Sequence, residues 1–297
     1  MSITPERNAC MNAGKDACMN ELIRRRVADA AYEAIRKAEL ELPSDYLAAL
    51  RNARSRESVD VAKREYENIF ENISDAKRLR VPTCRDTGMH IFYVTVPEGF
   101  PMTCAISEGI RDGVIRATKE IPLRPNAVDP LTRKNSGDNT GICAPAVHIS
   151  IGDKFTVTAM PKGGGSENMS RMYMLLPSQT GDIKKIVAET VLEAGGRPCP
   201  PLVLGIGIGG TFDSAPALAK EALLLPLDSM DDFEREICES VNKLGIGPMD
   251  LGGDTTCIAV KVKKAHCHTA SLPLAVNIQC WVNRHATVEV DTEGILS

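Results

Sequence analysis

The chain has 297 residues, of which 43% are hydrophobic and 25% are charged, with a formal net charge of −4. This composition is typical of a globular protein with a large core, built as one large domain or two smaller ones. The small negative charge gives no reason to expect nucleic acid or an anionic membrane surface as a partner. No stretch approaches the roughly 20 apolar residues of a membrane span.

The N-terminal segment, residues 1–20, shows neither the apolar core of a secretory signal nor helical periodicity. We therefore predict a loose extension over 1–20 and a folded domain over 21–297, with a division into two lobes left open. The ten cysteines are scattered and lack the short paired spacings of a disulfide scaffold. Together these features favour a reducing, cytoplasmic location.

Helices are predicted where apolar residues recur at intervals of three and four. In chain order they cover 21–40, 58–78, 103–121, a helix beginning near Glu167, 182–194, 214–224 and 231–244, the last two with Ser214 and Asp231 as N-caps.

Strands are predicted where apolar and β-prone residues run together. They cover 91–96, 147–151, 154–159, 202–204, 257–262, 274–279 and 286–291. Gly152-Asp153 is expected to close residues 147–159 into a hairpin. Because helices and strands mix without regular β–α–β alternation, the predicted fold class is α+β, an irregular mixed α/β arrangement with helices packed on a mixed or antiparallel sheet.

One loop combines a thiol, a guanidinium, a carboxylate and a hydroxyl in four consecutive residues, Cys84-Arg85-Asp86-Thr87. Pro82 and Gly88 flank these residues, which favours a rigid loop over a helix or a strand. The apolar run 91–96 predicts a buried strand behind the loop. Reactive side chains in this setting indicate a functional site, although a surface turn with an Arg–Asp ion pair explains the same residues.

Two glycine-rich segments lead to different predictions. Lys162-Gly163-Gly164-Gly165-Ser166 precedes a predicted helix, so its backbone N–H groups predict an anion site, with a flexible linker as the alternative. Gly205-Ile206-Gly207-Ile208-Gly209-Gly210 matches G-x-G-x-x-G, but it lies mid-chain and no clean acidic strand end follows at the distance expected of a dinucleotide site. We expect these glycines to allow close backbone packing.

Three cysteines, Cys84, Cys199 and Cys280, each lie at a loop or strand end beside Pro, Gly or Arg. Three thiolates on a cubane iron–sulfur cluster would leave one iron open as a Lewis acid, as a catalytic zinc keeps one position open. Spacing alone does not establish this chemistry. His266-Cys267-His268 leaves a zinc site, as in a zinc hydrolase, as another interpretation.

Five segments occur in the order Cys84-Arg85-Asp86-Thr87-Gly88, Lys162-Gly163-Gly164-Gly165-Ser166-Glu167-Asn168, Cys199-Pro200-Pro201, Leu244-Gly245-Ile246-Gly247-Pro248 and Cys280-Trp281-Val282-Asn283-Arg284. Together they resemble the α subunit of two-subunit class I fumarases and L(+)-tartrate dehydratases, which are iron–sulfur hydro-lyases. The resemblance runs from about Glu21 to about Asp291. It implies a cytoplasmic lyase of the tricarboxylic acid cycle, a fumarate hydratase that interconverts L-malate and fumarate plus water.

The resemblance also implies a cofactor and two catalytic residues. Cys84, Cys199 and Cys280 would hold a 4Fe–4S cluster through three of its irons. Asp86 matches the active-site acid beside the first cysteine. His268 lies where single-chain relatives have an active-site histidine.

The substrate implied by the resemblance is a small dicarboxylate. Arg124 matches an arginine that binds a substrate carboxylate, and the planar guanidinium suits two parallel hydrogen bonds. The backbone of Gly163, Gly164 and Gly165 would bind the same dianion, and Asp86 would also contact the substrate. Arg85 would lie beside it but stands where many relatives have Gln, so its contact is left open.

The resemblance implies a β subunit that carries the catalytic base, in an αβ or α2β2 assembly. An L(+)-tartrate dehydratase, which converts tartrate to oxaloacetate, is the alternative. The segment Gly165–Ser170 resembles fumarase-like chains more closely. A further alternative is a non-catalytic iron–sulfur redox module, which would ligate every iron and would need Cys267 or Cys143 as a fourth ligand.

Overall fold

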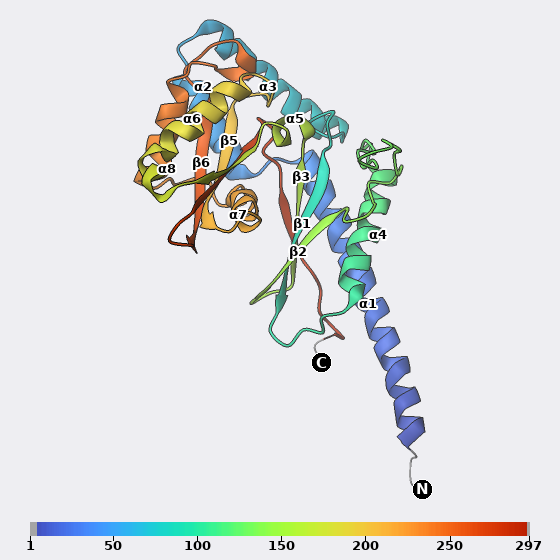
Figure 1. Cartoon of the computed structure of the whole chain (residues 1–297). Helices are drawn as coiled ribbons and strands as arrows, with labels where there is room; N and C mark the ends of the chain where they lie inside the picture. The colour runs from blue at the N-terminus through green and yellow to red at the C-terminus, as the bar shows by residue number, and fades with distance from the viewer. Residues whose placement is uncertain (1–4, 296–297) are drawn as a thin grey trace. The chain divides into compact units, whose positions relative to one another are not determined.

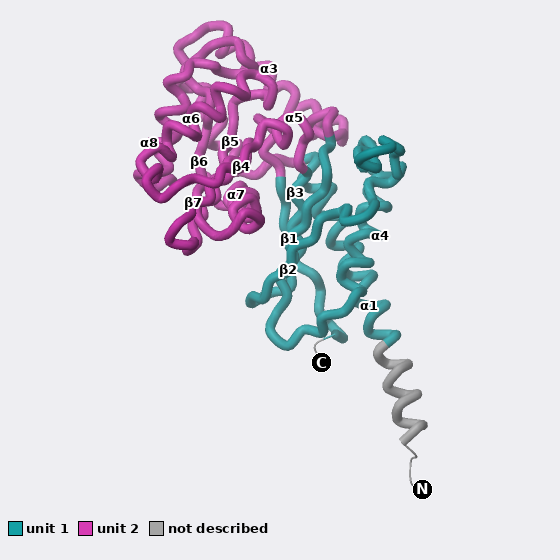
Figure 2. The backbone as a smooth tube through the Cα atoms, viewed as in Figure 1, with its two compact units in different colours: residues 1–40, 87–161, 285–297 teal, residues 41–86, 162–284 magenta. Residues whose placement is uncertain are grey.

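The computed structural model describes residues 5–295, with side chains described from residue 17 onward. Over that range the chain forms helices and two four-stranded mixed sheets, which confirms the predicted α+β class (Figure 1). The chain divides into two compact units (Figure 2). Unit 1 comprises residues 1–40, 87–161 and 285–297, and unit 2 comprises residues 41–86 and 162–284.

Unit 1 combines two helices with one sheet. Its elements are α1 (Pro5–Leu40), β1 (Met89–Pro97), α4 (Cys104–Glu120), β2 (Ala146–Gly152), β3 (Thr156–Lys162) and β8 (Ala286–Glu289). The order across the sheet is β2-β1-β3-β8. Of the loose extension predicted over residues 1–20, residues 1–4 lie outside the described part of the chain. From Pro5 onward the backbone is helical, as the start of α1.

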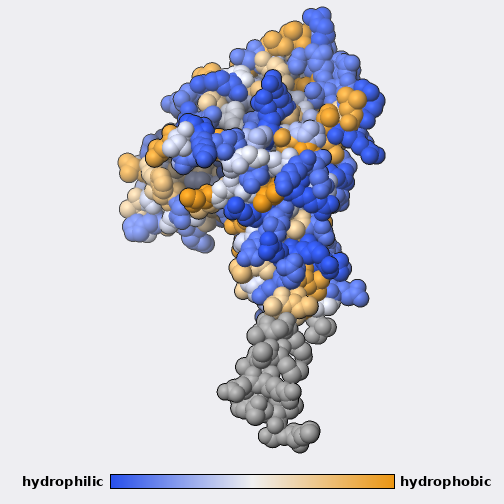
Figure 3. All heavy atoms as spheres, turned by 90° about the vertical axis from the view of Figure 1, so that its right-hand side faces the viewer, coloured by the Kyte–Doolittle hydropathy of each residue, from blue (hydrophilic) through white to orange (hydrophobic). Residues whose placement is uncertain are grey.

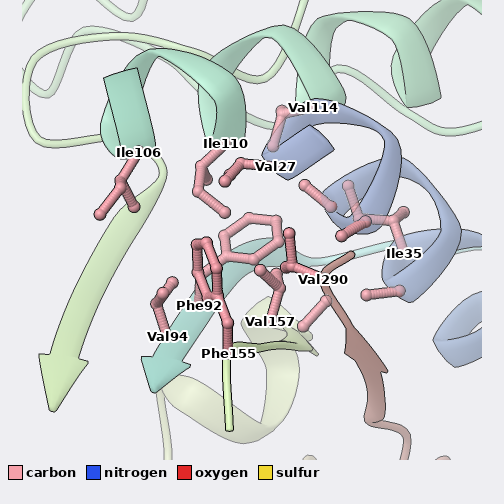
Figure 4. Packing of buried hydrophobic residues seen from close by; sticks show 14 of the residues in the cluster. Val27, Ile35, Phe92, Val94, Ile106, Ile110, Val114, Phe155, Val157 and Val290 are labelled. Carbon is pink, nitrogen blue, oxygen red and sulfur yellow. The ribbon is translucent and has the colours of Figure 1, made fainter. Parts of the chain in front are cut away.

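The core of unit 1 forms where α1 and α4 pack together and onto the sheet. In Figure 4, side chains of both helices converge with Phe92 of β1 and Val157 of β3. The two helices approach closely because α4 carries Gly109, where a Cβ atom would lie 2.5 Å from the backbone oxygen of Arg24. Each fully buried aliphatic or aromatic side chain in such a core stabilises the fold by about 1.5–3 kcal/mol relative to exposure.

The hairpin predicted over residues 147–159 is wrong. β2 pairs in parallel with β1, so that Ile91 lies opposite Ala146, and β1 lies between β2 and β3 in the sheet. Both strands exist, but Gly152-Asp153 does not close a tight turn between neighbours. Local turn chemistry cannot reveal that an earlier strand inserts between two later ones.

Unit 2 is the larger unit and combines helices with the second sheet. Its elements are α2 (Ser44–Arg56), α3 (Asp60–Leu79), α5 (Gly164–Glu167), β4 (Arg171–Leu175), α6 (Ile183–Ala194), β5 (Leu202–Gly210), α7 (Ser214–Ala222), α8 (Asp232–Asn242), β6 (Cys257–Cys267) and β7 (Leu272–Gln279), with short 3-10 turns at Pro177–Asp182 and Pro248–Asp250. The sheet order is β4-β7-β5-β6, and only the β5–β6 pair among these is parallel. Helix α2 was not predicted.

The glycines of β5 serve close packing, as the sequence predicts. A Cβ atom on Gly205 would lie 2.1 Å from the backbone oxygen of Ala219, and one on Gly207 would lie 2.1 Å from that of Ala215. Helix α7 therefore lies directly on the strand backbone. The G-x-G-x-x-G match is explained by this contact.

The helix predicted from Glu167 is a second correction. The glycines themselves form α5, a single turn that ends at Glu167, and Arg171–Leu175 is strand β4. β4 pairs with β7, and this tertiary pairing decides the conformation. Of the two predicted N-caps, Asp231 is confirmed, whereas the N-cap of α7 is Asp213, one residue before Ser214.

Among the described residues, no helix combines the length and the apolar character that crossing a membrane would require. On the face shown in Figure 3, hydrophobic residues form separate groups among hydrophilic ones. The large fully buried side chains, such as Tyr46, Tyr66 and Phe92, lie in the interiors of the two units.

Candidate active site

Unit 2 carries all three of the cysteines singled out in the sequence. Cys84 lies in the irregular loop after α3, Cys199 precedes β5, and Cys280 directly follows β7. Strands β5 and β7 are antiparallel, with Val203 opposite Gln279. The start of β5 and the end of β7 therefore lie side by side at the same end of the strands. The fold therefore places Cys199 and Cys280 at one end of unit 2.

Hydrogen bonds join the three cysteine loops to one another. The backbone N–H of Trp281 donates to the backbone oxygen of Cys199 over 3.1 Å. The guanidinium of Arg284 donates to the backbone oxygen of Asp86 over 2.5 Å. Segments far apart in sequence are thus held together by backbone contacts next to the thiols.

The Cys199 loop is held in an unusual backbone conformation. Cys199 has a φ of 56°, in the left-handed region that non-glycine residues seldom adopt. Its neighbour Pro200 accepts a backbone hydrogen bond from Met249 over 2.9 Å. Gly247 in the supporting loop also has a positive φ, and a Cβ atom there would lie 2.3 Å from Gly252. Met249, the residue after the Leu244–Pro248 motif, thus bonds to the loop that presents Cys199.

The three thiols are free, and each is at least partly accessible to solvent. Burial raises the pKa of the Cys84 thiol, and the nearby Arg284 guanidinium opposes this rise. Burial also raises the pKa of Cys199, and the negative charges that Cys280 and Cys84 would carry raise it further. The thiols are therefore close enough to repel one another as thiolates, and a cation between them would relieve that repulsion.

Asp86 and the glycine loop lie against each other in unit 2. The backbone N–H of Gly164 donates to Oδ2 of Asp86 over 2.8 Å, and a Cβ atom on Gly163 would lie 3.2 Å from the same oxygen. The sequence predicted that this loop would bind an anion. The anion observed at the Gly164 N–H is the side chain of Asp86, while Gly165 remains exposed.

The two candidate arginines lie on different units. Arg85 belongs to unit 2 and is exposed. Arg124 belongs to unit 1 and is exposed, but its backbone is firmly held: its N–H donates to Oγ1 of Thr87 over 3.0 Å, and its carbonyl accepts from Asn139 over 2.9 Å. Asn139, in the turn segment Asn135–Gly141, therefore helps to fix the Arg124 loop.

His268 does not join the cysteines within unit 2. It lies with His266 in the exposed hairpin between β6 and β7, where its Nδ1 accepts from the backbone of Ala270. Cys280 follows the other end of β7, which has 8 residues. At about 3.3 Å per residue, the strand separates the two by roughly 25 Å.

Sequence reasoning missed two buried cations of this region. Arg284 appears in a recognised motif, yet its bond to the Asp86 backbone could not be read from spacing. Lys162 is 2% exposed and lies beneath the glycine loop. A lysine is almost never fully buried unless it is paired, so a lysine beside glycines gave no local signal of burial.

Among the side chains that the structure describes, no three or more His, Cys, Asp or Glu residues are placed to hold one metal ion. His266 and His268 therefore have no third ligand there, which leaves the zinc interpretation without support. A cubane cluster spreads its ligands over separate irons, so it needs a wider spacing than a single ion does.

Comparison with known proteins agrees with the fold and the site. A family model described as fumarate hydratase (Fumerase) matches residues 28–289. The chain belongs to this family of hydro-lyases, which confirms the resemblance carried by the five motifs.

Individual relatives bear the names of two enzymes. A Methanocaldococcus jannaschii protein, provisionally named L(+)-tartrate dehydratase subunit alpha, is 42% identical over 91% of this chain and 100% of its own length. A Geobacillus stearothermophilus protein, provisionally named fumarate hydratase class I, is 35% identical over 89% of this chain but only 54% of its own length. The L(+)-tartrate dehydratase subunit alpha of Escherichia coli K12 is 30% identical over 85% of this chain and 86% of its own.

Proposed function

We propose that this chain is the α subunit of an iron–sulfur hydro-lyase that interconverts L-malate and fumarate plus water in the cytoplasm. The observation that carries the proposal is the grouping of Cys84, Cys199 and Cys280 with Asp86 in unit 2, through hydrogen bonds between their loops. Membership of the fumarate hydratase family supports it.

Cys84, Cys199 and Cys280 would hold a 4Fe–4S cluster and leave one iron without a protein ligand. These residues suit a cluster because their three thiols are free and partly accessible, and because they would repel one another as thiolates. When bound, the cluster supplies a Lewis acid for the departing hydroxyl group.

Within unit 2 no fourth thiol lies near the three cysteines, and Cys143, the other candidate for a fourth ligand, belongs to unit 1. Cys267 ends β6 in the exposed hairpin, so β7 separates it from Cys280. Cys238 and Cys257 are buried, and the Cys238 thiol donates to the Cys257 backbone oxygen. An electron carrier usually ligates every iron with protein groups, and these cysteines do not supply that ligand.

Asp86 would hold or move a proton at its carboxylate, which is partly exposed. The Gly164 N–H holds one carboxylate oxygen of Asp86, and the Arg284 guanidinium holds the Asp86 backbone oxygen. The Asp86 side chain therefore keeps its orientation even when no substrate is bound. Because Asp86 already accepts from the Gly164 N–H, a substrate carboxylate would face the exposed backbone of Gly165, with Gly163 and Gly164 beside it.

Arg124 would bind the second carboxylate through its guanidinium, a role that rests on the resemblance. The bonds from Thr87 and Asn139 to its backbone would hold the arginine in place. Arg85, exposed beside Cys84, would contribute positive charge rather than a fixed contact.

His268 would act on the active site of a second copy of this chain. The length of β7 keeps it from the cysteines of its own unit 2, and the hairpin that carries it is exposed. This route requires an assembly with two α chains, such as α2β2, so the mass of the assembly tests it.

The catalytic base would come from a β subunit. The two relatives with tartrate dehydratase names are themselves named as alpha subunits, and this chain spans about half of the named fumarate hydratase class I. We therefore expect the purified single chain to bind a cluster but to turn over negligibly.

L(+)-tartrate dehydratase is the second candidate function. The 42% identical relative carries that name, which favours it. The Gly165–Ser170 segment favours the fumarase. Tartrate and malate differ by one hydroxyl group, so the decision rests on substrate tests.

The test is anaerobic co-purification with the candidate β subunit, reconstitution with iron and sulfide, and measurement of turnover with L-malate and L-tartrate. The proposal predicts malate turnover that is lost in air and in Cys84→Ser, with Cys104→Ser as the control. Tartrate turnover alone would assign the second candidate. A loaded cluster with neither substrate consumed would refute both enzymes.

A further inference from the structure

Lys162 is a buried cation beneath the glycine loop. Its side chain is 1% exposed. Its Nζ donates to the backbone oxygen of Ile278 over 2.6 Å and to Oγ of Ser166 over 2.9 Å, and it lies 3.5 Å from Oε2 of Glu167. All three ammonium protons therefore have partners in unit 2.

These contacts join the glycine loop to the strand that presents Cys280. Ser166 in turn donates to the backbone oxygen of Gly163 over 3.2 Å. Ile278 lies two residues before Cys280, and its N–H donates to Oγ of Ser170 over 3.1 Å. Both backbone groups of Ile278 are thus tied to the 163–170 segment, and Lys162 makes one of the two ties.

The same network leaves a net positive charge inside unit 2. Glu167 accepts from Lys220 and lies beside Lys162, so one carboxylate faces two ammonium groups. Asn277 donates its amide to Glu167 over 3.4 Å without adding charge. The charges of Lys162, Lys220 and Glu167 sum to one positive unit near the end of β7, where anionic thiolates would lie, and the Asp86 carboxylate adds a negative charge at the glycine loop.

We propose that Lys162 is a positioning residue for the hydro-lyase reaction: it holds the glycine loop, and with it Asp86, in register with Cys280, and its buried charge stabilises the anionic cysteine ligands. The inference deepens the proposed function and rests on it for the catalytic consequence. The role of Lys162 in holding the glycine loop does not depend on the cluster or on a β subunit.

Lys261 offers a matched control in the same unit. It is 7% exposed, lies 3.2 Å from the buried Glu234 and donates to the backbone oxygen of Ser229 over 2.7 Å. It belongs to β6, and its ammonium group bonds to Ser229 and Glu234 rather than to the glycine loop. Lys162→Met and Lys261→Met therefore each remove a buried, paired lysine, but only the first touches the proposed network.

The first measurement is hydrogen–deuterium exchange on the full-length chain without iron. Lys162→Met is expected to speed exchange in residues 163–170 and 278–280 about tenfold or more, whereas Lys261→Met should leave both peptides unchanged. Ser166→Ala deletes a single link and should show a smaller change in the same peptides. It decides the question should Lys162→Met fail to fold.

The second measurement uses the reconstituted chain with its β subunit. Lys162→Met should release iron to a chelator about tenfold faster than Lys261→Met and should lower kcat roughly 10–100-fold, because a small misplacement of catalytic groups is costly. KM should change less than kcat. Equal behaviour of the two variants in exchange and in iron release would overturn the proposal.

The two measurements separate failure of this inference from failure of the proposed function. A wild-type chain that binds no iron would refute the hydro-lyase, while the exchange experiment would still decide whether Lys162 holds the loop. A wild-type enzyme that turns over malate beside an unperturbed Lys162→Met variant would refute the inference alone.

Discussion

The two units build their interiors from different interactions. In unit 1, α1 and α4 pack on the sheet through aliphatic and aromatic side chains such as Phe92, Ile110 and Val157. Unit 2 has a comparable apolar cluster but also buries two lysines beside glutamates, Lys162 and Lys261. Burying apolar side chains carries no desolvation cost, whereas burying a charge destabilises the fold unless the charge is fully paired. Unit 1 also buries a charged side chain, Glu39, but the buried lysines paired with glutamates belong to unit 2, the unit that carries the three cysteines.

The largest expected effect separates cysteines of the two units. Cys280→Ser in unit 2 should abolish cluster binding and lower kcat by at least about 10³-fold, because the Lewis acid that activates the hydroxyl is lost. Cys104→Ser, at the exposed start of α4 in unit 1, should leave both unchanged. Iron content per chain and malate turnover measure the difference. Equal iron binding by both variants would contradict the assignment.

The core of unit 1 should give the next largest effect. Phe92 is fully buried between the sheet and the helices, so Phe92→Ala should lower the free energy of unfolding by about 3–5 kcal/mol. Leu131→Ala, at a residue that is 90% exposed, should change it by less than about 0.5 kcal/mol. Urea denaturation followed by circular dichroism gives both values. Similar losses for the two would show that the core is misassigned.

Most elements were predictable because periodicity and capping act locally. The N-cap at Asp231 and the packing glycines Gly205 and Gly207 are examples. The wrong predictions concern segments whose conformation is decided by tertiary contacts. β1 inserts between β2 and β3, and β7 recruits Arg171–Leu175 as a strand, and neither partner is visible from within the segment concerned.

The candidate site divides in the same way. Cys84, Cys199 and Cys280 were singled out from the sequence by their loop and strand-end settings, but only the family resemblance assigned them to one cluster, since their spacing carries no geometry. The burial of Lys162 had no signal, because lysine is ordinarily a surface residue. For His268, the resemblance suggested a site residue, but the register of β7 puts it at the far end of the sheet from Cys280.

Burial of Lys162 should also make stability depend on pH. Burial lowers its pKa from 10.5 to about 8, against the opposing effect of Glu167. Between these values the unfolded chain binds more protons than the folded one, so this contribution to stability rises with pH from about 8 to 10.5 and is lost as pH falls through 8. Relative to Lys162→Met, the wild type should gain up to about 3 kcal/mol across that window. A difference in unfolding free energy that is independent of pH would contradict the shift.

The smallest expected effect compares the N-caps of one helix from each unit. In unit 2, Asp231 accepts from the N–H of Glu234 over 2.7 Å, and Glu234 accepts in return from the N–H of Asp231 over 3.0 Å. Asp231→Ala should therefore lower the free energy of unfolding by about 1 kcal/mol.

In unit 1, Thr103 occupies the N-cap of α4 without a side-chain capping bond, and its buried hydroxyl has no hydrogen-bond partner among the described residues. Thr103→Ala removes an unsatisfied polar atom rather than a bond, so it should be neutral or slightly stabilising. Thermal melts of the two variants measure the contrast. A loss at Thr103 as large as that at Asp231 would mean that the two caps contribute alike.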